Sequence, residues 1–186
     1  MSSLRNVQGR VVAKVGAFKK DRSGFTAIEF AMVVIPFMML VFGIINIGLF
    51  YFTTFSLENA LERAARLVRT GQAQSGQQPM TAEDFKQAVC GRMPSFVDCS
   101  GKLRVDVRSF PSFSSIQGNE PPGLDGSGNL GTGFSFAPGS GGDVVLVTAF
   151  YEWDMTKLMP FISLGNMASG ARLIQAATAF RNEPFN

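Results

Sequence analysis

The sequence predicts an α+β protein in which one long N-terminal helix is followed by a small domain with a short antiparallel sheet. Residues 30–57 carry no charged side chain, a stretch of about 28 residues. At ~1.5 Å rise per residue, a helix of that length exceeds the roughly 30 Å hydrocarbon layer of a membrane. Residues 103–108, 143–153 and 172–180 have the alternating or β-branched character of strands. A chain of 186 residues, 46% of them hydrophobic, therefore has room for one membrane segment and one small core.

The first 22 residues are strongly basic. They carry six Lys and Arg side chains against the single acid Asp21, a net charge of +5, so residues 25–186 have a net charge of −2. Basic residues beside a membrane span favour the cytoplasmic side, so we expect the N-terminus inside and the C-terminal domain outside. We interpret the charge as a topology signal and not as a nucleic-acid-binding patch. A short amphipathic surface helix in this region is the alternative.

Glu29 lies at the edge of the apolar stretch, where it needs a positively charged partner. An ionised carboxylate drawn to the middle of a bilayer costs about 2.5 to 3.5 kcal/mol. Cleavage after Gly24 would make Phe25 the new N-terminus, with an α-ammonium group that could pair with Glu29. The partner could belong to the same subunit or to a neighbouring one.

A basic leader, Gly24, the hydrophobic Phe25, then Glu29, Phe30 and a long apolar helix together resemble a type IV prepilin signal. The Glu followed directly by an aromatic residue is similar to the prepilins of the tight-adherence (Tad, or Flp) pilus. Among these, the sequence most resembles the TadE-like pseudopilins. The chain is longer than the very short major subunit of that pilus, and residues 181–185 read Arg-Asn-Glu-Pro-Phe, a tail associated with the TadE-like group.

The resemblance implies a non-enzymatic minor pilin or pseudopilin with a pilin-like fold. Residues 1–24 would be the leader removed by a prepilin peptidase, residues 25–56 the transmembrane helix and residues 57–186 the extracytoplasmic domain. Glu29 and Phe30 would serve in recognition and assembly. The implied location is the bacterial inner membrane, in a single pass with the C-terminal domain in the periplasm, or in association with the pilus.

The implied partners are the peptidase, other Tad pilus subunits, the inner-membrane assembly platform and membrane lipid. The implied role is in pilus assembly, secretion and cell adhesion, with no cofactor, small-molecule substrate or nucleic acid. The alternative is an uncleaved single-pass anchor that displays an extracytoplasmic binding domain, with residues 111–142 as its contact surface. An enzyme ranks third among the hypotheses. The chain has no histidine and no Ser or Cys set beside a base, so hydrolase or transferase chemistry lacks its usual residues.

Within the long helix, Pro36 is expected to introduce a bend. Gly43 and Gly48 could admit a neighbouring helix, with Asn46 hydrogen-bonding across the contact, although packing against lipid fits equally well. Beyond the span, apolar residues recur at helical spacing and charged residues fill the other face, as solvated surface or as a contact with partner subunits. The apolar positions are Leu57, Leu61, Ala64, Ala65 and Val68. We expect the helix to stop at Thr70 and Gly71.

Cys90 and Cys99 fall in the segment assigned to the outside, where an oxidising compartment permits a disulfide. A zinc site is the rival interpretation and a poor one, since two thiols without any histidine do not complete the usual ligand set. We predict no metal site.

The rest of the domain follows local signals. Thr81 is expected to cap a short helix that ends near Gly91. Residues 111–142 are rich in Gly, Ser and Pro and predict a long exposed loop. Residues 158–164 are apolar and are expected to cover the sheet or touch the membrane.

Overall fold

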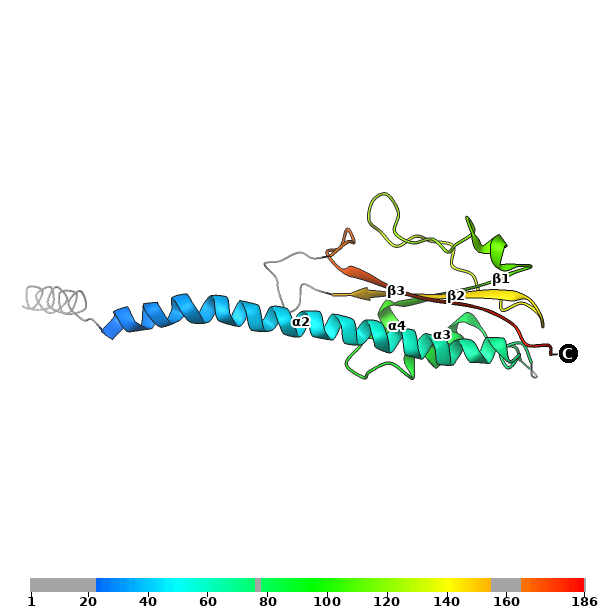
Figure 1. Cartoon of the computed structure of the whole chain (residues 1–186), viewed down its shortest axis with the longest axis horizontal. Helices are drawn as coiled ribbons and strands as arrows, with labels where there is room; N and C mark the ends of the chain where they lie inside the picture. The colour runs from blue at the N-terminus through cyan, green and yellow to red at the C-terminus, as the bar shows by residue number, and fades with distance from the viewer. Residues whose placement is uncertain (1–22, 76–77, 155–164, 186) are drawn as a thin grey trace, which may run out of the picture. The chain divides into compact units, whose positions relative to one another are not determined.

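The computed structural model describes residues 23–75, 78–154 and 165–185, and it confirms the α+β class (Figure 1). The contacts between residues divide the chain into two compact units, Met1–Phe42 and Gly43–Asn186. The basic residues of the leader and the apolar residues 158–164 lie outside the described parts of the chain. The elements in chain order are α2 (Ser23–Arg69), α3 (Ala82–Cys90), α4 (Cys99–Lys102), β1 (Leu103–Phe110), the 3-10 helix η1 (Phe113–Ile116), β2 (Val144–Trp153) and β3 (Arg172–Arg181).

Helix α2 begins with the apolar segment. Its part from Phe25 to Arg69 reaches a mean hydropathy of 2.5 in its most apolar stretch, and it is the one helix of the described residues long and apolar enough to span a membrane. Large apolar side chains such as Met32 and Val33 are about 70% exposed, at 72% and 70%. A soluble protein would bury such a surface, so this exposure fits a single-pass membrane protein whose helix faces lipid.

The last turns of α2 are amphipathic, as predicted. Leu57, Leu61, Ala64 and Val68 are at most 1% exposed and belong to the hydrophobic core of the Gly43–Asn186 unit. The charged residues of the opposite face, such as Glu62 and Arg66, are exposed. The helix ends at Arg69, and Gly71 adopts the positive φ of 79° that a residue without Cβ accepts at a helix C-terminus. The predicted stop is therefore confirmed.

The sheet is a three-stranded antiparallel meander with β2 in the centre. Leu103 pairs with Tyr151 and Phe110 with Val144 between β1 and β2, while Val144 also pairs with Arg181 of β3. One face of β2, formed by Val145, Val147, Ala149, Tyr151 and Trp153, joins α2 in the core. The β-branched and aromatic run of β2 is buried on both faces, which explains why its sequence does not alternate.

Residues 111–142 form the predicted loop, but part of it also pairs with β1. The backbone of Val107 in β1 accepts a hydrogen bond from Ala137 (2.7 Å) and donates one to Ser135 (2.8 Å), so the segment pairs along the outer edge of β1. The ring of Phe134 lies 5.6 Å, centroid to centroid, from that of Phe150 on β2. The segment is largely exposed, as predicted, but the sequence did not predict that part of it covers the edge of β1 and packs a ring against β2.

Helix α3 begins and ends as predicted. Thr81 and Asp84 form a capping box, in which the Thr81 hydroxyl accepts a bond from the Asp84 backbone and the Asp84 carboxylate accepts one from the Thr81 backbone. The hydrogen bond from the Thr81 side chain lowers the pKa of Asp84 below its usual value, and the bond from the Thr81 backbone adds a smaller effect in the same direction. Phe85 and Val89 are fully buried and hold α3 against the core.

Candidate functional site

The candidate processing site lies at the start of α2. Ser23 and Gly24 are its first two residues, so the peptide bond between Gly24 and Phe25 belongs to the first helical turn. Phe25 is 65% exposed and Phe30 is 69% exposed, and Glu29 is exposed as well. All the side chains that the sequence singled out here are thus accessible within this chain.

The spacing of these residues sets what they can do. Phe25 and Glu29 stand four residues apart on one helix, so they share a face and their Cβ atoms are about 5 to 6 Å apart. If Phe25 were the first residue, its α-amine would stand about one turn from Glu29, whose side chain leans toward the N-terminus of the helix. A carboxylate near a helix N-terminus is also favoured by the helix dipole. The geometry suits a charge pair within one subunit or with a neighbour.

The predicted pair of cysteines forms a disulfide. Cys90 ends α3 and Cys99 begins α4, and their Cα atoms are 5.5 Å apart. Asp98 caps α4 by accepting a hydrogen bond from the backbone of Gly101. Among the described residues, no three side chains of metal-ligating type come together.

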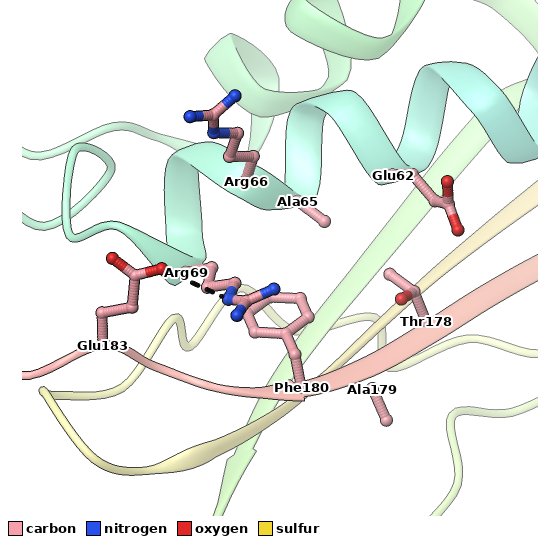
Figure 2. A pocket seen from close by; sticks show the side chains of 8 residues that line it. All are labelled: Glu62, Ala65, Arg66, Arg69, Thr178, Ala179, Phe180 and Glu183. Atoms are coloured by element: carbon pink, nitrogen blue, oxygen red, sulfur yellow. Dashed lines mark ion pairs between the residues drawn. The ribbon is translucent and has the colours of Figure 1, made fainter.

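A groove of about 580 Å³ lies between the end of α2 and β3 (Figure 2). Its apolar floor includes Ala65 and Phe180, and an ion pair of 3.5 Å between Arg69 and Glu183 closes one end. Both charged side chains are about half exposed, so this pair stabilises the fold by at most about 1 kcal/mol. The described residues that line the groove include no His, Cys or Ser, and we assign no chemistry to it.

The C-terminal tail, residues 181–185, is fastened to two parts of the domain. The Asn182 side chain is 2% exposed and donates to the carbonyl oxygens of Pro138 (2.9 Å) and Ser140 (3.0 Å). The Phe185 ring lies over Gly71, where an added Cβ would come within 2.5 Å of it. The tail therefore holds the end of α2 and the end of the 111–142 segment together.

Comparison with known families bears on the first part of α2. Residues 24–66 match the model of a family described as TadE-like protein. This segment is TadE-like. No curated protein and no solved structure matches the chain significantly.

The TadE-like segment contains all four residues proposed for processing and recognition, Gly24, Phe25, Glu29 and Phe30. It begins at the residue that would precede the cleaved bond and ends within α2, one turn before Arg69. The disulfide, the sheet and the tail lie beyond it, so their arrangement comes from the structure.

The sequence left open whether Asn46 hydrogen-bonds across a contact with a neighbouring helix. Its side chain is 1% exposed and is covered by its own chain, which argues against that alternative. Within the described residues, its Oδ1 atom accepts no hydrogen bond. Gly48 does face open space: apart from its own stretch of helix backbone, none of the described residues has an atom within 4 Å of the position that a Cβ would take there. A close helix contact through Gly48 thus remains a prediction without Asn46.

A second residue, Asp106, was missed altogether. It is 0% exposed and accepts hydrogen bonds from Arg108 Nε (2.8 Å) and from the Ser135 backbone (2.8 Å). In sequence it looks like one of the solvent-facing charges of an alternating strand. Only the Gly-rich segment folded over that face turns it into a buried anchor for residues 133–137.

Proposed function

We propose that the chain is a non-enzymatic pseudopilin that acts in the assembly of a tight-adherence pilus. The observation that carries this proposal is the TadE-like match, which starts at Gly24, the second residue of α2. The TadE-like family implies involvement in that assembly. The charge asymmetry of the sequence supports an N-terminus in the cytoplasm and a domain in the periplasm of a bacterial inner-membrane protein.

A prepilin peptidase is proposed to cut between Gly24 and Phe25. The bond lies among the first residues described for α2, so this part of the helix must unwind before the bond can enter the peptidase in an extended conformation. Glycine also lowers the cost of leaving the helical conformation and lets the chain approach catalytic groups closely. Gly24 thus suits a bond that must become extended before it is cut.

The new α-amine of Phe25 is proposed to neutralise Glu29. Both groups lie at the edge of the apolar stretch, where either charge alone is costly once lipid or protein surrounds it. The pair allows the helix to pack beside the helices of other pilus subunits. The proposed partners are other Tad subunits and the assembly platform of the inner membrane. The assembled pilus would then mediate cell adhesion.

The experiment that tests the proposal is an intact-mass measurement of the chain extracted from bacterial membranes with and without the peptidase. We expect a mature chain that begins at Phe25 only when the peptidase is active. A chain that keeps its first 24 residues beside an active peptidase overturns the proposal. That result would favour the uncleaved anchor with an extracytoplasmic binding domain.

A further inference from the structure

Three exposed aromatic rings gather on one side of the Gly43–Asn186 unit. Phe52 and Phe55 come from α2 and Phe96 from the disulfide-closed loop of residues 90–99; we call these three residues the aromatic patch. They are 52%, 60% and 58% exposed. Phe52 and Phe96 are stacked, with ring centroids 6.1 Å apart and planes inclined by 23°. Residues far apart in the sequence therefore build one continuous apolar surface.

The disulfide loop is built to present Phe96 outward. Its ends are joined by Cys90 and Cys99, and Val97 is buried in the core while Met93 packs against it. Phe96 lies between these two anchored residues yet is not part of the core. A phenyl ring left in water contributes no burial free energy to the fold. Because the anchored neighbours hold Phe96 at the surface, its exposure indicates an apolar environment outside the domain.

The position of the patch along α2 matches the edge of a bilayer. The charge-free stretch begins at Phe30, and about 20 helical residues cross the hydrocarbon layer, which brings its far boundary near Phe50. Phe52 and Phe55 follow within about 3 to 8 Å of helix rise. That distance is the thickness of one headgroup layer, where aromatic side chains concentrate in membrane proteins.

One end of the sheet lies beside Phe50 and so marks the end of the domain at this boundary. Arg172, at the start of β3, has its guanidinium 5.6 Å from the Phe50 ring centroid. Arg172 pairs with Trp153 at the end of β2. The opposite end of β3, at Arg181, lies at the end of α2, where Glu183 meets Arg69. The patch is thus at the end of the domain closest to the apolar part of α2.

Positive charge lies directly beside the patch. A groove of about 600 Å³ runs between α2 and the disulfide loop, lined by Phe52 and Phe55 and also by Arg63 and Arg92. None of the described residues that line this groove is acidic. Side chains on a helix lean toward its N-terminus, so Arg63 leans toward the membrane side. Arginines within a Debye length of about 8 to 10 Å attract anionic headgroups.

We infer that the aromatic patch is a membrane-docking face that rests among the headgroups of the outer leaflet, with Arg63 and Arg92 on its aqueous side, where they attract anionic lipid. The occupant of the face is the lipid surface, because exposed apolar side chains of α2, at Ile44, Ile45 and Ile47, lead up to the patch along the same helix. The inference requires that α2 spans a membrane. It requires neither cleavage after Gly24 nor pilus assembly, so it can fail or hold independently of the proposed function.

The test uses the full-length chain in vesicles that contain anionic phospholipid. Phe96→Trp places a fluorophore in the patch, and emission of the parent chain, whose one tryptophan is the buried Trp153, supplies the baseline. Phe37→Trp, within the span, is the positive control. Phe113→Trp, 53% exposed beyond the distant end of β1, is the matched negative control. Intact mass checks that each variant keeps the disulfide.

We expect lipid brominated near the headgroup to remove most of the emission that Phe96→Trp adds, and to leave the emission of Phe113→Trp unchanged. Replacing both cysteines by serine in the Phe96→Trp chain should weaken this quenching, since the loop is then no longer closed. If aqueous acrylamide quenches the Phe96→Trp and Phe113→Trp variants alike and the brominated lipid quenches neither, the patch lies in water and the inference is wrong. Shielding of the Phe96→Trp fluorophore from both quenchers would also overturn it, in favour of a protein neighbour.

Discussion

The backbone N–H of Glu183 donates a hydrogen bond of 2.9 Å to the carbonyl oxygen of Arg69, the last residue of α2. The carbonyl groups at the end of a helix have no partner within it, and the tail supplies one here. The same tail buries Asn182 and lays Phe185 over Gly71. The end of the chain thus acts as a strap that joins the helix to the sheet.

The strap predicts unequal effects for two neighbouring residues. Asn182→Ala removes two buried hydrogen bonds to Pro138 and Ser140, and we expect it to lower the free energy of unfolding by about 2 kcal/mol. Glu183→Ala removes only a half-exposed ion pair and should cost less than about 1 kcal/mol. Denaturant unfolding in detergent, followed by Trp153 fluorescence, measures both. Equal effects would mean that the side-chain bonds of Asn182 do not matter.

Asp106 is expected to anchor the Gly-rich segment. Asp106→Ala leaves the backbone of Ser135 and the guanidinium of Arg108 without their carboxylate, and should cost about 2 to 3 kcal/mol. The control is Asp125→Ala, whose carboxylate is exposed and, in the part of the chain that the structure describes, accepts bonds from its own turn, at Ser127 and Asn129. Hydrogen exchange of the Ser135 and Ala137 amides should accelerate in the first variant. Unchanged protection there would contradict the anchoring role.

Tyr151 should make the domain sensitive to alkali. Burial, reinforced by the charges of Asp98 and Asp154, raises the pKa of Tyr151 to about 12. The unfolded chain loses this proton near pH 10 and the folded chain holds it, so stability that is complete below pH 10 falls as the pH rises from about 10 to about 12. Tyr151→Phe should flatten that fall, which is on the order of 1 to 3 kcal/mol. Identical slopes for parent and variant above pH 10 would refute the assignment.

Gly24→Val is expected to block processing. A β-branched side chain at this position obstructs close approach to a peptidase and restricts the backbone. Gly48→Val is the control, since its backbone position is open and lies far from the bond. Immunoblots and intact mass of membrane fractions should show the full-length precursor in the first variant and the mature chain in the second. Normal maturation of Gly24→Val would count against the proposed cleavage site.

Glu29→Ala is expected to impair assembly with other pilus subunits but not insertion into the membrane. The helix stays apolar and should still enter the membrane, but the α-amine of Phe25 loses its partner. We expect association with other pilus subunits to weaken about ten-fold or more, equivalent to about 1.4 kcal/mol. Glu58→Ala, which removes an exposed acid from the same helix outside the apolar stretch, should leave association intact. Co-purification and counts of surface pili measure the difference. Normal piliation of Glu29→Ala would contradict the proposed charge pair.

Most elements of the fold were predictable because their signals are local. The helical spacing of Leu57, Leu61 and Val68, the Thr81 cap and the β-branched run of β2 each favour one conformation within a few residues. The candidate processing site is also contiguous, from Gly24 to Phe30, so it could be found without knowing the fold. The sequence permitted a disulfide between Cys90 and Cys99, the two cysteines of the chain, and the structure decided that they are bonded.

The sequence alone determined the apolar span, the acid at its edge, the strands and the short helix, because spacing and side-chain type act between near neighbours. Only the tertiary structure decided that Asp106 is buried, that Asn46 is covered by its own chain and that Phe96 stacks on Phe52. The physical reason is that burial depends on what a distant segment lays over a residue. A Gly-rich stretch, a disulfide loop and a five-residue tail carry no periodicity that reveals where they will come to rest.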